Sequence, residues 1–124
     1  MIDTGDIIHL KGNPVPNIET KWVVVVAKEQ KWCFCINTEN RLMYNCTELK
    51  KKSHPFLKNE KHYIACKDVI EYKEDNVTGK YGSLNKDELL ALMSHIINNV
   101  KTINQNKKLI ILKSLQEKVD EFSL

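Results

Sequence analysis

The chain has 124 residues, which predicts a single domain over residues 1–124 with a core large enough to fold alone. Its 19 basic and 16 acidic residues give a net charge of +3, and this mild excess is typical of a lysine-rich, solvated surface. The longest apolar run, residues 22–27, is far shorter than the ~20 residues of a membrane helix, and the first residues lack the pattern of a signal peptide. We therefore expect a cytoplasmic protein that is not associated with a membrane.

The four cysteines leave open free thiols, a zinc site or two disulfide bonds. Cys33 and Cys35 are separated by one residue, whereas the cysteines of zinc-binding pairs are commonly separated by about two to four. Cys46 and Cys66 form no second pair of that kind, and nothing else is typical of a secreted, disulfide-bonded protein. The pattern favours buried free thiols, and we expect no metal ion and no cofactor.

Short apolar segments separated by polar turns predict a small β-barrel over residues 1–80. The predicted strands are residues 6–10, 22–27, 32–37, 41–46, 62–66 and 69–72. The segment 22–27 is apolar on both faces, so we expect it in the centre of the sheet, paired with 32–37 through a polar turn. Gly12, Pro14 and Pro16 predict a loop over residues 11–20, and residues 48–55 are expected to form a polar connection.

The hydrophobic period changes near Gly82, which predicts two helices within residues 81–124 and a β-rich α+β fold. Asn85 and Glu88 have the spacing of a capping box at the start of the first helix. Its apolar residues recur at helical spacing: Leu89, Leu92, Met93, Ile96, Ile97 and Val100. The second helix is expected over residues 106–122, with an apolar stripe of Leu112, Leu115, Val119 and Phe122. We expect both stripes to pack on the core, with contact to a partner as the alternative for the second.

Four short motifs follow one another along the chain. Gly5-Asp6 opens the first strand, Lys21-Trp22 leads into the valine-rich strand, Thr38 follows the next strand, and residues 82–88 (Gly-Ser-Leu-Asn-Lys-Asp-Glu) open a helix. The PemK/MazF toxins carry similar motifs in the same order, and the chain resembles this family over about residues 5–100. Lys21-Trp22 stands in place of the family's Arg-Pro pair. The resemblance implies an SH3-like barrel followed by two C-terminal helices. It also implies a dimeric, metal-independent endoribonuclease toxin that cleaves single-stranded RNA and is neutralised by an antitoxin protein.

Metal-independent RNA cleavage needs a cation at the phosphate and groups that move protons between the 2′-hydroxyl and the leaving oxygen. By the resemblance, Lys21 takes the place of the phosphate-stabilising arginine and Thr38 supplies a hydroxyl, at neighbouring ends of the predicted hairpin. Histidine is the natural acid–base residue near neutral pH, so His54, which follows a run of lysines, is the third candidate catalytic residue. The structural alternatives are a solvated lysine, a turn threonine and a surface histidine, and His62 is also expected at the surface.

Binding of single-stranded RNA requires neutralised phosphates and aromatic surfaces for unpaired bases. The candidate phosphate-binding residues are Lys50, Lys51, Lys52, Lys58, Lys61 and Arg41. The candidate stacking residues are Trp22, Trp32, Phe56 and Tyr63, with core packing as the alternative for the two tryptophans.

Three functions remain open from the sequence. A ribonuclease toxin requires Lys21, Thr38 and one histidine in one concave site. A catalytically inactive SH3-like barrel that binds nucleic acid or protein requires only a basic face. An interaction protein that assembles through its helical tail would expose the apolar stripe of the second helix. Motifs for nucleotide hydrolysis and proteolysis are absent from the sequence, which disfavours both activities.

Overall fold

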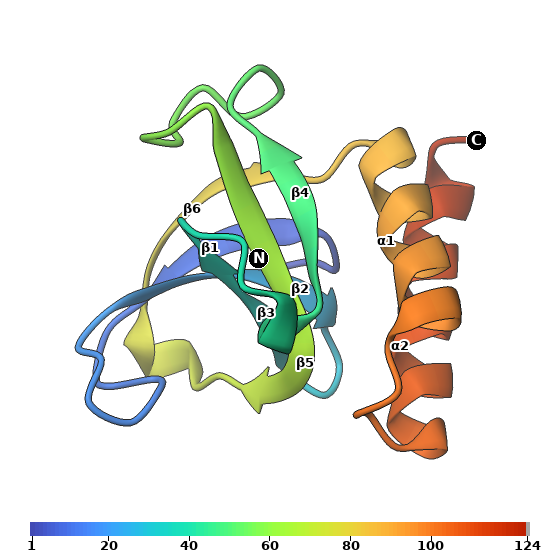
Figure 1. The fold of residues 1–124 in the computed structure, drawn as a ribbon, viewed down its shortest axis with the longest axis horizontal. Helices are drawn as coiled ribbons and strands as arrows, with labels where there is room; N and C mark the ends of the chain where they lie inside the picture. Colours follow the sequence, from blue (N-terminus) through green and yellow to red (C-terminus); the bar gives the residue numbers. More distant parts are fainter. Residues whose placement is uncertain (124) are drawn as a thin grey trace.

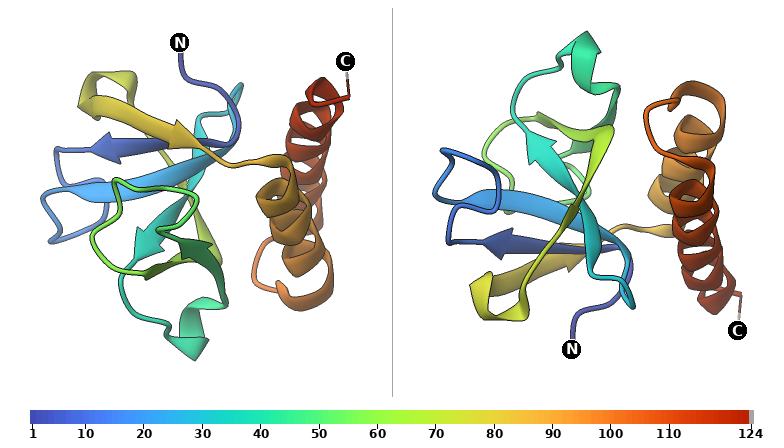
Figure 2. Two further views of the ribbon diagram at one scale, coloured as in Figure 1. Left: turned by 90° about the horizontal axis from the view of Figure 1, so that it is seen from above. Right: turned by 90° about the horizontal axis from the view of Figure 1, so that it is seen from below.

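The computed structural model describes residues 1–123, which form one six-stranded antiparallel sheet packed against two helices. The elements, including two 3₁₀ helices (η1 and η2), are β1 (Asp6–Leu10), β2 (Lys21–Ala27), β3 (Trp32–Asn37), η1 (Leu42–Tyr44), β4 (Cys46–Lys50), β5 (Lys61–Glu71), η2 (Glu74–Asn76), β6 (Val77–Ser83), α1 (Lys86–Asn99) and α2 (Gln105–Glu121). The strand order is β4-β5-β3-β2-β1-β6, so β4 and β6 are the edges of the sheet as described. Both helices lie side by side on one side of the strands (Figures 1 and 2). The predicted β-rich α+β fold is thus confirmed.

The valine run of β2 lies in the interior of the sheet because both of its faces are buried. Val24 and Val26 belong to the larger core, which the sheet shares with the two helices. Val23 and Val25 belong to a smaller core on the other face of the strand. The predicted hairpin of β2 and β3 is confirmed, with Val23 opposite Cys35 and Val25 opposite Cys33.

The first helix begins as predicted. The side chain of Asn85 accepts a hydrogen bond from the backbone N–H of Glu88 (2.8 Å), and the Glu88 carboxylate accepts one from the backbone N–H of Asn85 (2.9 Å). This capping box satisfies two N–H groups that otherwise have no partner within the helix. The fully buried side chains of α1 are Leu89, Leu92 and Ile96, whereas Ile97 is exposed.

The stripe predicted for α2 is partly wrong. The buried residues are Ile111, Leu115 and Val119, which are four residues apart and face the larger core. Leu112 is only half-buried, and the Phe122 side chain is 49 % exposed. Because Leu115 and Val119 pack on the core, the apolar stripe of α2 is not exposed as a whole. This contradicts the hypothesis of an interaction protein that assembles through its helical tail.

Three predictions in the second half of the sheet are wrong. Of residues 41–46, only Cys46 belongs to a strand; the others contain η1 and a left-handed turn at Asn45 (φ 52°). β4 instead occupies Cys46–Lys50, inside the segment expected to be a polar connection, and β5 is one long strand where two were expected. β6 was not predicted, and it extends the sheet beyond residue 80. Both missed strands are edges, and β4 has one buried residue and β6 has none, so they lack the hydrophobic alternation by which strands are recognised.

The four cysteines are free thiols, with Cys33 and Cys66 buried and Cys35 and Cys46 half-buried. Neither of the helices described in residues 1–123 is long and apolar enough to span a membrane.

Candidate functional site

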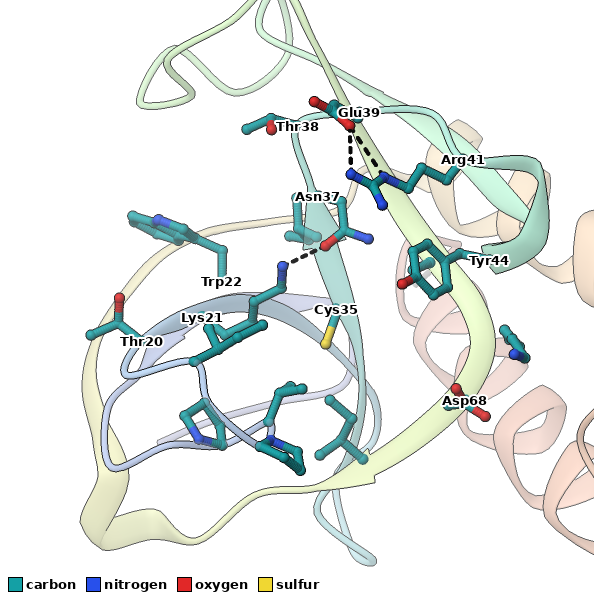
Figure 3. A pocket seen from close by; sticks show the side chains of 18 residues that line it. Thr20, Lys21, Trp22, Cys35, Asn37, Thr38, Glu39, Arg41, Tyr44 and Asp68 are labelled. Carbon is teal, nitrogen blue, oxygen red and sulfur yellow. Dashed lines mark hydrogen bonds and ion pairs between the residues drawn. The ribbon is translucent and has the colours of Figure 1, made fainter.

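A cleft of ≈ 730 Å³ lies where the ends of β2 and β3 meet the middle of β5 (Figure 3). Prolines and aliphatic side chains of the loop before β2 form one wall, and the segment after β3 forms another. Its polar lining residues are Thr20, Lys21, Asn37, Thr38, Glu39, Arg41, Tyr44, Lys67 and Asp68. Two predicted catalytic residues, Lys21 and Thr38, and the predicted RNA contact Arg41 therefore line one concave site.

The register of the hairpin brings Lys21 to the side of Asn37. Val23 is paired with Cys35, so the residues two positions outward, Lys21 and Asn37, lie at the same level of the sheet. The Nζ atom of the half-buried Lys21 donates a hydrogen bond to Oδ1 of Asn37. Figure 3 shows the lysine side chain pointing toward that amide on the neighbouring strand. A neutral acceptor thus orients the ammonium group without cancelling its charge, which leaves it able to bind an anion.

Thr38 and Arg41 enter the cleft from the segment that follows β3. Thr38 is exposed and follows Asn37 directly, so its hydroxyl is open to solvent on the rim. Arg41 contacts one carboxylate oxygen of Glu39 through Nε (3.1 Å) and a terminal guanidinium nitrogen (3.0 Å). Both side chains are more than half exposed, so this ion pair contributes little to stability and exchanges readily for another anion.

Cys35 lies on β3 at the floor of the cleft, beside the two charged residues Lys21 and Asp68. Burial raises the pKa of the Cys35 thiol, the positive charge of Lys21 lowers it, and the negative charge of Asp68 raises it again. The net shift is upward, so the thiol is protonated at neutral pH. Cys35 is therefore a poor nucleophile and acts here as an apolar part of the wall.

His54, the third predicted catalytic residue, is not in the cleft, and its expected surface position is wrong. The residue is only 4 % exposed, and Nε2 lies 2.9 Å from both carboxylate oxygens of Glu88. Because a carboxylate only accepts, Nε2 donates and the imidazole connects the loop after β4 to the first turn of α1. His62 is also buried rather than at the surface, and its Nε2 accepts a hydrogen bond from the backbone N–H of Asn59 (3.1 Å).

The predicted phosphate-binding lysines form a separate surface. Lys50, Lys51, Lys52, Lys58 and Lys61 come from the end of β4, the loop after it and the start of β5. All except Lys51 are exposed, and Lys61 forms an ion pair with Glu48 (3.5 Å). The loop that carries them touches the cleft indirectly, because its Phe56 stacks on Trp22 with ring centroids 5.3 Å apart. Trp22 itself lines the cleft.

Several lining residues were missed from the sequence. Asn37 could have been found, because the hairpin register places it beside Lys21 once the two strands are paired. Asp68 could not, since its position depends on β5 continuing as one strand through residues predicted as a break. Tyr44 was placed on a strand, whereas η1 turns it into the cleft.

A scan of the sequence against models of known protein families finds no match, and a search of curated proteins finds none either.

Proposed function

We propose that this chain binds single-stranded RNA in the cleft and cleaves it there without a metal ion, as a toxin of the PemK/MazF type with an SH3-like barrel. The observation that carries the proposal is the placement of Lys21 and Thr38 on one concave site, with Lys21 oriented by Asn37. These are the two positions at which the resemblance implies a cation and a hydroxyl. A small antiparallel sheet with a buried apolar cluster on each face supports the barrel assignment.

The chemistry follows from the charges that line the cleft. The 2′-oxygen attacks the phosphorus and the bond to the 5′-oxygen breaks, which gives a 2′,3′-cyclic phosphate and a 5′-hydroxyl that takes its proton from water. The Lys21 ammonium group stabilises the negative charge that grows on the phosphate during this attack, and electrostatic stabilisation of this kind is usually the largest contribution to catalysis. The hydroxyl of Thr38 donates a hydrogen bond to a phosphate oxygen on the rim. Asp68, an exposed carboxylate that lines the cleft, replaces His54 as the candidate acceptor of the 2′-hydroxyl proton.

The basic loop after β4 extends the proposed RNA path beyond the cleft. Its lysines neutralise phosphates as exposed point charges, and the loop is joined to the cleft through Phe56 and Trp22. A cytoplasmic location, neutralisation by an antitoxin and a homodimer belong to the same proposal. Exposed apolar side chains on the helices, Leu90, Ile97, Leu109 and Ile110, support contact with a protein partner.

Binding without cleavage is the second candidate function, and one observation favours it. Among residues 1–123, the side chains that line the cleft include no histidine, although the sequence interpretation required one for catalysis. A lysine in place of the family arginine also loses the planar, two-pronged contact with a phosphate.

An assay that follows binding and cleavage on the same RNA separates these candidates. A 5′-labelled, mixed-sequence single-stranded RNA is incubated in excess chelator with the wild type, Lys21→Ala, Thr38→Ala and Lys113→Ala. Lys113 is an exposed lysine on α2 and serves as the matched control. Discrete fragments that persist in Lys113→Ala and vanish in the other two variants support the ribonuclease. A shifted but intact band that depends on Lys21 supports the binding module, and RNA that is neither bound nor cut by folded protein contradicts both.

A further inference from the structure

We infer that His9, Trp22 and Tyr81 form a stacking site for an unpaired nucleobase of the RNA whose phosphate is bound at Lys21. The sequence indicated Trp22 as a candidate stacking residue but not this site, because the strand that carries Tyr81 was not predicted. The inference rests on the proposed RNA binding. It adds that the protein recognises a base of the RNA outside the cleft, as well as the phosphate inside it. We call these three side chains the aromatic platform.

Pairing of three strands brings the platform to one face of the sheet. His9 on β1 lies opposite Trp22 on β2 and opposite Gly79 on β6, and Tyr81 is two residues after Gly79. The register of β1 and β6 shifts at Tyr81, which has no partner on β1, and the tyrosine ring lies over Gly79. The Trp22 ring centroid is 4.8 Å from that of His9 and 4.6 Å from that of Tyr81. Three rings from three strands are therefore in contact.

Gly79 makes room for the tyrosine ring. A Cβ atom at this position would lie 3.0 Å from Cε2 of Tyr81 and 3.1 Å from its hydroxyl oxygen, closer than side chains normally approach. The tyrosine ring therefore lies directly against the backbone of β6 instead of extending into solvent. It is still 48 % exposed, which leaves much of its surface open to a ligand.

Two further contacts fix the rings of the platform in place. Phe56 stacks on Trp22 at an interplanar angle of 30°, and a Cβ atom at Gly82 would meet the Phe56 ring at 3.3 Å. The imidazole of His9 is fixed by a hydrogen bond between Nδ1 and Oγ1 of Thr78 (2.7 Å). Rings fixed in this way lose little conformational freedom when a base stacks on them, so more of the stacking energy appears as affinity.

Trp22 connects this surface to the phosphate site. It lines the cleft together with Lys21, its neighbour in sequence, and it is the central ring of the platform. Lys21 and Trp22 are consecutive residues of β2, so their side chains leave opposite faces of the strand. An RNA whose phosphate is bound by Lys21 would therefore pass the start of β2 and place a nearby base on the platform. The tyrosine hydroxyl and the imidazole give the rim polar groups that suit a base better than a purely apolar ligand. Trp32, by contrast, is covered by the ammonium group of Lys107 at 5.3 Å from its ring.

The test compares binding of a short single-stranded RNA by the wild type, Tyr81→Leu, Tyr81→Phe and Gly79→Ala, at several salt concentrations. Phe122→Leu is the control, since Phe122 is an equally exposed ring elsewhere. Loss of stacking predicts affinity about tenfold lower in Tyr81→Leu, a smaller loss in Gly79→Ala, and little change in Tyr81→Phe and Phe122→Leu. The salt dependence should stay that of the wild type, because stacking releases no counterions.

A second measurement leaves the platform unmutated, in case Tyr81→Leu does not fold. In a Trp32→Phe protein Trp22 is the only tryptophan, so its fluorescence should be quenched by the RNA but not by an oligomer of the same length without bases. Equal quenching by both oligomers, or wild-type affinity in folded Tyr81→Leu while Lys21→Ala weakens binding, would overturn the stacking site alone. Binding that depends on Tyr81 but not on Lys21 would instead overturn the proposed phosphate site. Absence of RNA binding by the wild type would overturn both.

Discussion

Lys21 and Asn37 face each other across the hairpin of β2 and β3, where the lysine ammonium group donates a hydrogen bond to the asparagine side-chain oxygen. This contact fixes a cation at the edge of a cleft without neutralising it. Replacement of the amide by a carboxylate should have the opposite effect, because the lysine would then be paired with a negative charge. Asn37→Asp is therefore expected to weaken RNA binding about tenfold or more, with Asn37→Ala much closer to the wild type. Fluorescence anisotropy with a labelled RNA measures both, and equal affinities of the two variants would contradict this role of Asn37.

The alkylation rate of the Cys35 thiol reports whether RNA occupies the cleft. Burial raises the pKa values of both Cys35 and Cys46, so both half-buried thiols should be alkylated slowly at neutral pH. Cys35 lines the cleft, whereas Cys46 lies at the start of β4 outside its lining. Bound RNA is expected to slow the alkylation of Cys35 and leave that of Cys46 unchanged, as followed by mass spectrometry of peptides. The same rate at Cys35 with and without bound RNA would place the RNA elsewhere.

The contact between His54 and Glu88 should stabilise the fold and play no part in chemistry. His54→Ala removes the donor to a carboxylate that also caps α1, and we expect it to lower the free energy of unfolding by about 2 kcal/mol. Urea unfolding measures this loss, and a cycle with Glu88→Gln isolates the pairwise contribution. RNA cleavage per folded molecule should be unchanged in His54→Ala. A stably folded His54→Ala variant that no longer cleaves RNA would show that His54 takes part in catalysis.

Stability should depend on pH through His62. Burial lowers the pKa of His62 below its usual value of about 6.5, so the unfolded chain binds this proton more readily than the folded chain. The free energy of unfolding is therefore expected to fall as the pH decreases from above 6.5 toward the lower pKa of the folded state. Urea unfolding across this range should give a shallower decrease for His62→Gln. If the free energies of unfolding of His62→Gln and the wild type decrease in parallel with pH, another titrating group is responsible.

The parts of the fold that the sequence predicts are those with strong local patterns. The valines of β2, buried on alternate faces, and the capping box of Asn85 and Glu88 each carry enough information within a few residues. The edge strand β6 has no such pattern, because its stability comes from pairing with β1 and from rings that pack over Gly79 and Gly82.

In the candidate site, too, only the residues that depend on local pairing were predictable from the sequence. Lys21 and Thr38 flank the hairpin, so the pairing of two neighbouring strands brings them to one cleft. His54 is 33 residues from Lys21 in sequence, and its position depends on how a long loop folds. The preceding run of lysines made His54 a candidate catalytic residue, with a surface position as the alternative, but the loop carries His54 to Glu88, where it is buried.

The most direct test of RNA cleavage at this cleft is the cleavage rate of one labelled single-stranded RNA in chelator by the wild type, Lys21→Ala and Lys21→Arg, with Lys113→Ala as the control. We expect Lys21→Ala to reduce the rate by about 10²-fold or more, because it removes the cation that faces the phosphate. Lys21→Arg should retain or raise the rate, since a guanidinium group makes a two-pronged contact with phosphate. Cleavage by folded Lys21→Ala at the rate of Lys113→Ala would contradict the assignment of the active site to this cleft.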